Sequence, residues 1–140
     1  MTPSRPKLLL VEPDGDLGQE IARRLAGSFE VTVADGGKQA LRDLELLPAD
    51  VVLMELDLPG ELGIGLLAEL RRARANVVLV PMVTEGDRFS RIEAMVREVA
   101  NDLLVKPVDL DRLDGTLTHL YRIRRADGRS AANEAGGALP

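Results

Sequence analysis

The sequence contains no cysteine, one histidine and few aromatic residues. Without cysteine the protein can form neither a disulfide framework nor a thiolate site for metal or redox chemistry, and His119 alone cannot form a histidine cluster. The aromatic residues are one Tyr and two Phe, although 45% of the residues are hydrophobic. The core must therefore be built from aliphatic side chains.

Long hydrophobic runs and an excess of basic residues are also missing. The longest apolar run covers residues 77–83, whereas a membrane-spanning helix needs about 20 such residues. Residues 1–6 lack the apolar segment of a signal peptide. The net charge of −5 disfavours general binding to nucleic acid or to anionic membranes. We therefore expect a soluble cytoplasmic protein with no nucleic-acid or membrane partner.

Short apolar runs alternate with amphipathic stretches of helical spacing. The central runs are apolar throughout, as strands are when helices cover both faces of a parallel sheet. The pattern predicts one α/β domain over residues 1–125, a doubly wound five-stranded parallel sheet. Residues 126–140 are rich in Ala and Gly, and we expect a flexible tail or linker there. The strand-like runs are residues 7–11, 30–34, 51–56, 77–83 and 103–105.

Two local features lead to further expectations. Asp16 has the residue type of a helix N-cap, with Gln19 three positions later as its capping-box partner. Pro81 lies within the fourth strand-like run, where it removes a backbone donor. We expect a bulge or an early end of that strand.

Chemistry is expected where the strands end, because ligands of open α/β sheets bind outside the carboxyl ends of the strands. Acidic groups, one hydroxyl and one lysine follow these ends, and together they predict a site for a phosphate group and a metal ion. The residues are Glu12 and Asp14 after the first strand, Glu55 and Asp57 at the third, Thr84 after the fourth and Lys106 after the fifth.

These residues belong to an ordered set of motifs that resembles the receiver domains of response regulators in two-component signalling. The resemblance covers roughly residues 7–124. It implies a flavodoxin-like fold with strand order 2-1-3-4-5 and helices on both faces, and a signalling domain rather than an enzyme. The motifs are Leu9-Leu10-Val11-Glu12, Val52-Leu53-Met54-Glu55-Leu56-Asp57-Leu58-Pro59-Gly60, Val83-Thr84 and Ala100-Asn101-Asp102-Leu103-Leu104-Val105-Lys106-Pro107.

In receiver domains a sensor histidine kinase transfers a phosphoryl group to an Asp on the third strand, and a divalent metal ion balances the negative charge. The resemblance places Glu55 at the acceptor position and Glu12 at the first metal-binding acid. It implies that the backbone carbonyl of Asp57 faces the metal, and that Thr84 and Lys106 bind the phosphoryl oxygens.

The sequence departs from this pattern at three positions. Glu55 replaces the acceptor Asp, Pro13 replaces the second metal-binding acid, and Leu103 replaces the aromatic switch residue. Glu55 reaches one methylene further than Asp, so its oxygens are displaced from the acceptor position. Pro13 removes a metal ligand, and Mg²⁺ demands near-ideal octahedral geometry. We expect no cofactor, with Mg²⁺ as the one candidate, and an atypical receiver that signals without phosphorylation.

Each site residue also has alternative interpretations. Glu55 either mimics the phosphorylated state or is an ordinary ion-pair partner of Lys106. The alternative function is a working phosphoacceptor that uses a displaced carboxylate, Asp57 or Glu55. Asp14 and Asp16 are either replacement metal ligands or loop and N-cap groups, and Thr84 is either a remnant of the phosphate site or a helix cap.

The expected partner is another protein or a second copy of this chain, bound through the fourth helix, fifth strand and fifth helix, about residues 87–124. A sensor histidine kinase is a further candidate. Mixed charge on this face favours specific pairing. We expect Arg122, Arg124, Arg125 and Arg129 to form a solvated helix end rather than a nucleic-acid patch. The charged residues of the face are Arg88, Arg91, Arg97, Asp102, Asp111, Arg112 and Arg122.

Overall fold

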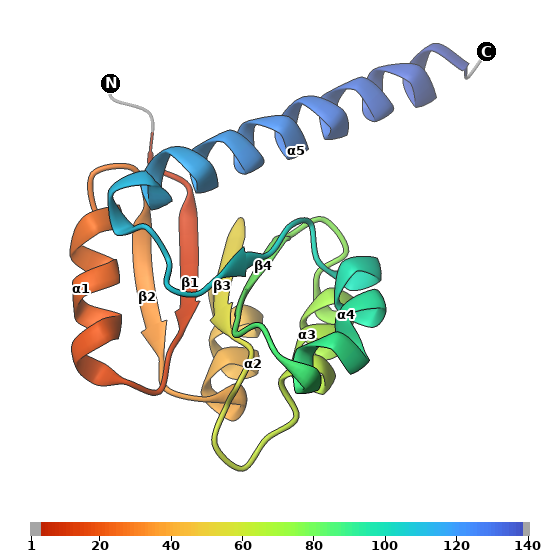
Figure 1. Ribbon diagram of the computed structural model, residues 1–140. Helices are drawn as coiled ribbons and strands as arrows, with labels where there is room; N and C mark the ends of the chain where they lie inside the picture. The colour runs from red at the N-terminus through yellow and green to blue at the C-terminus, as the bar shows by residue number, and fades with distance from the viewer. Residues whose placement is uncertain (1–3, 139–140) are drawn as a thin grey trace.

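The computed structural model describes residues 4–138, and side chains for residues 4–127. Its centre is an all-parallel sheet of five strands in the order β2-β1-β3-β4-β5 (Figure 1). This arrangement confirms the predicted doubly wound fold and its strand order. The strands are β1 (Lys7–Val11), β2 (Glu30–Ala34), β3 (Val51–Glu55), β4 (Val78–Val83) and β5 (Leu104–Val105).

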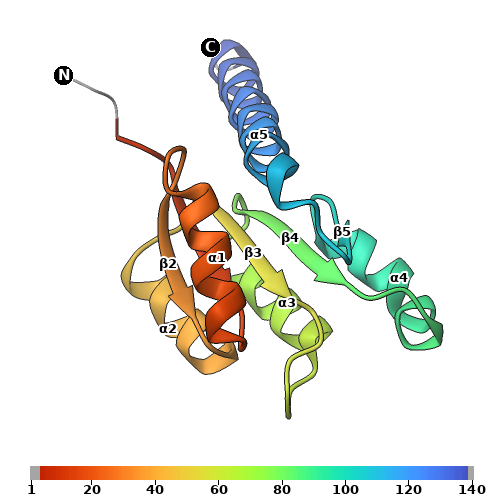
Figure 2. The same cartoon turned by 60° about the vertical axis from the view of Figure 1, so that its left-hand side comes forward.

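Helices cover both faces of the sheet, because successive strand side chains point to opposite faces. In β1, Leu9 and Val11 belong to the core under α2, α3 and α4, whereas Leu8 and Leu10 belong to the core under α1 and α5 (Figure 1 and Figure 2). Both cores are mainly aliphatic, as the composition predicts. The helices are α1 (Gly15–Leu25), α2 (Gly37–Leu46), α3 (Gly63–Ala73), α4 (Asp87–Val99) and α5 (Leu110–Ala138).

β4 runs through Pro81 without a bulge, so the expectation of a bulge or an early strand end is wrong. Pro81 pairs with Met54 of β3 in an unbroken register. The carbonyl of Met82 accepts a hydrogen bond from the N–H of Leu56 on the β3 side, so Pro81, one residue earlier, faces the β5 side. Because β5 pairs with β4 only from Met82 onward, the missing N–H of Pro81 interrupts no ladder hydrogen bond.

The first turn of α1 is capped by Asp14 and not, as expected, by Asp16. The carboxylate of Asp14 accepts hydrogen bonds from the backbone N–H groups of Asp16 (3.0 Å) and Leu17 (3.1 Å). Both acids suit an N-cap by residue type, and the extended backbone at Asp14 decides between them. The side chain of Asp14 is thereby committed to the helix.

α5 continues well beyond the sheet and projects from the domain (Figure 1 and Figure 2). The flexible tail expected from residue 126 is instead helical as far as Ala138, and residues 139–140 lie outside the described residues. Alanine has the highest helix propensity and no proline interrupts this stretch, so helix formation is physically reasonable. The boundary at residue 125 stays a prediction. No helix in the described chain is both long and apolar enough to cross a membrane.

Candidate functional site

The predicted site residues follow the carboxyl ends of β1, β3, β4 and β5. The residue that follows each of β1, β3 and β5 still donates a backbone hydrogen bond to the neighbouring strand, which fixes the backbone there. The N–H of Glu12 donates to Ala34 (2.9 Å), and the N–H of Lys106 donates to Val83 (2.9 Å). Glu55 is the last residue of β3 and lies opposite Met82. The backbone of the site is therefore part of the rigid sheet.

Glu55 and Lys106 form an ion pair inside this site. The ammonium group of Lys106 contacts Oε2 of Glu55, whose side chain is 5% exposed. Oε1 of Glu55 accepts a hydrogen bond from the backbone N–H of Asp57 (3.3 Å). Oε2 of Glu55 therefore lies in ion-pair contact with the lysine but forms no hydrogen bond to a described residue, and Oε1 is held by the loop that follows β3.

Glu12 is a second buried carboxyl group beside this pair. It is 4% exposed, and its Oε2 has no hydrogen-bond partner among the described residues. The pKa of Glu12 is raised to about 7: burial is the main cause, the charges of Glu55 and Asp14 add to it, and Lys106 acts in the opposite direction. Two buried carboxyl groups thus share one lysine, and near neutral pH Glu12 exchanges between its neutral and charged forms.

The donor set does not fit the Mg²⁺ ion that receiver domains use. Pro13 contributes no side-chain oxygen, Asp14 caps α1, and Glu55 is paired with Lys106. Among the carboxylates at the positions where the family binds metal, only Glu12 forms neither a helix cap nor an ion pair among the described residues. Across residues 4–127, whose side chains are described, no group of three or more acidic, His or Cys side chains is arranged to hold a metal ion.

The side chain of Asp57 is not buried with that of Glu55. β3 ends at Glu55, and Asp57 is exposed in the loop beyond it. Its Oδ1 lies 3.8 Å from Nη1 of Arg88 at the start of α4. The sequence placed Arg88 only on the expected partner face. Its position at the start of the helix that follows β4 was the available signal that it could reach the site.

The surroundings of Thr84 and Leu103 could not be predicted from the residues next to them in the sequence. Thr84 is exposed and lines a cavity of about 180 Å³ together with Asp57 and Arg88. It does not cap α4, whose N-cap is Gly86. Leu103 is half-buried and packs against the core under α2, α3 and α4. The structure therefore groups Glu12, Glu55 and Lys106 together, with Thr84 in an adjacent cavity.

Comparison with known proteins shows the family of the chain. The family "Response regulator receiver domain" matches residues 8–118. The chain is 37% identical over 123 residues to the transcriptional activator protein PfeR of Pseudomonas aeruginosa, covering 87% of this chain and 40% of PfeR. It is 36% identical over 134 residues to the sensory transduction protein RegX3 of Mycolicibacterium smegmatis, covering 94% of this chain and 54% of RegX3.

A solved structure supports the same fold. The CheY-like response regulator receiver domain protein of Methanospirillum hungatei superposes with a TM-score of 0.82 at 17% identity, covering 89% of this chain and 99% of that one. The protein belongs to the response-regulator receiver family of two-component signalling. The chain spans about half or less of the length of the two curated relatives described above.

Proposed function

We propose that this protein is a phosphorylation-independent receiver, a signalling module that works through protein–protein contact. The observation that carries the proposal is the buried ion pair between Glu55 and Lys106. In the family, the lysine at this position binds the phosphoryl group. Here the longer side chain of Glu55 already presents a negative charge to it, so the site holds its charge pair without any phosphoryl transfer.

The chemistry of phosphoryl transfer is unfavourable in this pocket. An incoming phosphodonor is an anion, and it would meet the carboxyl groups of Glu12 and Glu55 with Lys106 as the nearby cation. Receiver domains overcome such repulsion with a divalent metal ion. We therefore propose that this protein needs neither Mg²⁺ nor a phosphodonor.

Intact-mass spectrometry after incubation with acetyl phosphate and Mg²⁺ tests the proposal. We expect no gain of a phosphoryl group by the unaltered protein. The matched control is Pro13→Asp/Glu55→Asp, which restores the family's second acid and its acceptor and is expected to become labelled. Stoichiometric labelling of the unaltered protein would contradict the proposal.

Phosphorylation on a displaced carboxylate is the alternative outcome. Asp57 is exposed and lies beside Arg88 and the cavity of Thr84, so a donor could reach it from solvent. If the unaltered protein is labelled, Asp57→Asn and Glu55→Gln identify the acceptor. Loss of the label in only one of these variants assigns the site.

The interaction surface that we propose is the α4–β5–α5 face. Met95 on α4 and Val105 on β5 are exposed apolar side chains there, 48% and 39% accessible. Arg91 and Arg112 are exposed on the two helices. Apolar residues surrounded by charged ones are the usual composition of a protein interface. Asp111 pairs with Arg24 of α1 and is less available for a partner. The partner is a second copy or another protein, with a sensor histidine kinase as a further candidate.

A further inference from the structure

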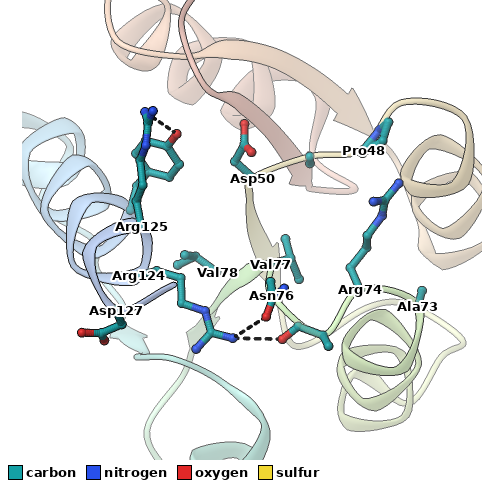
Figure 3. A pocket seen from close by; sticks show the side chains of 13 residues that line it. Pro48, Asp50, Ala73, Arg74, Asn76, Val77, Val78, Arg124, Arg125 and Asp127 are labelled. Carbon is teal, nitrogen blue, oxygen red and sulfur yellow. Dashed lines mark hydrogen bonds between the residues drawn. The ribbon is translucent and has the colours of Figure 1, made fainter. Parts of the chain in front are cut away.

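A large cavity lies at the end of the sheet opposite Glu12, Glu55 and Lys106. Its volume is about 840 Å³, a size that accommodates a small-molecule ligand. It is formed by the loops before β3 and β4 and by the part of α5 that leaves the sheet (Figure 3). No part of the phosphorylation chemistry of receivers takes place at this end of the sheet.

Three arginines line the cavity, and none of them forms an ion pair with a described residue. Arg124 donates to the carbonyl of Ala75 (3.0 Å) and to Oδ1 of Asn76 (3.4 Å), and Arg125 donates to the hydroxyl of Tyr121 (3.4 Å). Arg74 lies across the cavity from Arg124 (Figure 3). Five other arginines, outside the cavity, do pair with carboxylates. They are Arg23, Arg24, Arg88, Arg97 and Arg112.

A fourth arginine adds to the positive charge behind the cavity. Arg71 is half-buried and donates to the carbonyls of Val77 and Val99, among others. Burial lowers the pKa of Arg71, and the charge of Arg124 lowers it further. In a protein of net charge −5, this end of the sheet gathers cations that lack anionic partners within the described chain. A bound anion would supply such a partner.

The remaining lining residues indicate more than a simple anion site. The carboxylates of Asp50 and Asp127 also line the cavity, and Asp50 already accepts the backbone N–H of Lys7 (2.8 Å). Carboxylates repel a bare phosphate but accept hydrogen bonds from hydroxyl and amino groups. The ring of Tyr121 and the side chain of Val77 add flat and apolar surface.

We propose that this cavity binds a nucleoside polyphosphate. Arg74 and Arg124 hold the phosphates, because guanidinium groups match phosphate oxygens in a bidentate manner. The carboxylates of Asp50 and Asp127 accept from ribose hydroxyls or base amino groups, and the base lies against Tyr121. The bound ligand would connect the loop before β4 with α5 and so hold the projecting helix at one angle.

Isothermal titration of the full chain with ATP, inorganic triphosphate and adenosine tests this assignment. We expect saturable binding of ATP, weaker binding of triphosphate and none of adenosine. Arg74→Gln/Arg124→Gln should weaken ATP binding at least about tenfold, since each arginine forms charge-assisted hydrogen bonds. Arg122→Gln is the matched control, because Arg122 is an exposed arginine on the same helix and does not line the cavity.

Circular dichroism establishes whether the double variant folds. If it does not, Arg125→Gln replaces it, because the one side-chain contact described for Arg125 is with Tyr121. Absence of ATP binding, or equal affinity in the unaltered and cavity variants, would overturn the proposal. Equal affinity for ATP and triphosphate would also overturn it, since the base and ribose would then contribute nothing.

Discussion

One methylene group separates Glu55 from the aspartate of other receiver domains, and the Glu55 carboxylate contacts Lys106. Lys106 is about one-third exposed, whereas Glu55 and Glu12 are buried. Removing Lys106 would leave two buried carboxyl groups without a cation. Unpaired buried charge is much more costly than the loss of a surface ion pair.

We therefore expect Lys106→Met to lower the free energy of unfolding by about 2 kcal/mol at neutral pH, a value reduced for the partial exposure of the lysine. Urea denaturation measures the change. Glu55→Leu/Lys106→Met should recover most of the loss, because it removes the charge together with its partner. If both variants lose the same stability, the ion pair does not determine the energetics of the pocket.

Glu12 predicts an unusual pH dependence. Its pKa rises from the ordinary value of 4.5 to about 7 in the folded protein, so the folded state retains a proton that the unfolded state releases. The contribution of Glu12 to stability is complete below the unfolded pKa and is lost as the pH rises through 7. Its size is at most about 3 kcal/mol.

Urea denaturation at about pH 5 and about pH 8 measures this effect. We expect Glu12→Gln to be less sensitive to this pH change than the unaltered protein, because glutamine does not titrate. An identical pH dependence in the two proteins would mean that Glu12 keeps an ordinary pKa.

At the scale of elements, the turn from β3 into α3 depends on Gly63. A Cβ atom built on Gly63 would lie 1.8 Å from the carbonyl oxygen of Leu56, so the backbone would have to move. Gly65, two residues further into the same helix, has ordinary space around it, with Leu62 Cβ at 3.8 Å. The two glycines form a natural pair for comparison.

We expect Gly63→Ala to destabilise the protein by about 3 kcal/mol, the upper range for overpacking. Gly65→Ala should instead be neutral or stabilising by up to about 1 kcal/mol, because alanine favours the helix. Thermal and urea unfolding of both variants measure the difference. Equal effects would show that the loop after β3 adjusts freely.

The sequence predicts elements well where a hydrophobic pattern repeats. It predicts local details poorly where they depend on backbone angles or on another segment of the chain. The apolar runs predict the central strands β1, β3 and β4 because burial on both faces leaves little room for polar residues. Whether Asp14 or Asp16 caps α1 depends on backbone angles that the residue types do not specify. Pro81 is tolerated because β5 is short, a property of another segment. The order of the motifs predicts that Glu12, Glu55 and Lys106 lie together, but not that Thr84 lines a cavity with Asp57 and Arg88.

At the scale of the whole molecule, the α4–β5–α5 face is where we expect association. Reversing charge with Arg91→Glu/Arg112→Glu should weaken binding to a partner or to a second copy and leave the fold intact, because both side chains are exposed. Analytical ultracentrifugation measures self-association, and circular dichroism measures the fold. Lys38→Glu/Arg42→Glu on the exposed face of α2 is the matched control. Unchanged association in the first variant would place the interface elsewhere.

Pro81 also disfavours one way in which copies of this protein could associate, the pairing of strands edge to edge. A strand with open backbone groups can template another strand, which leads to aggregation. Beside the short β5, both backbone groups of Leu79 are satisfied by Asn101, whose N–H donates at 2.9 Å and whose Oδ1 accepts at 2.8 Å, and Pro81 has no N–H to offer. This flank of the sheet therefore lacks the row of free donors that strand addition and amyloid growth require. Because β5 offers only two residues at this edge, assembly on this side depends mainly on side chains, and single substitutions can adjust its strength.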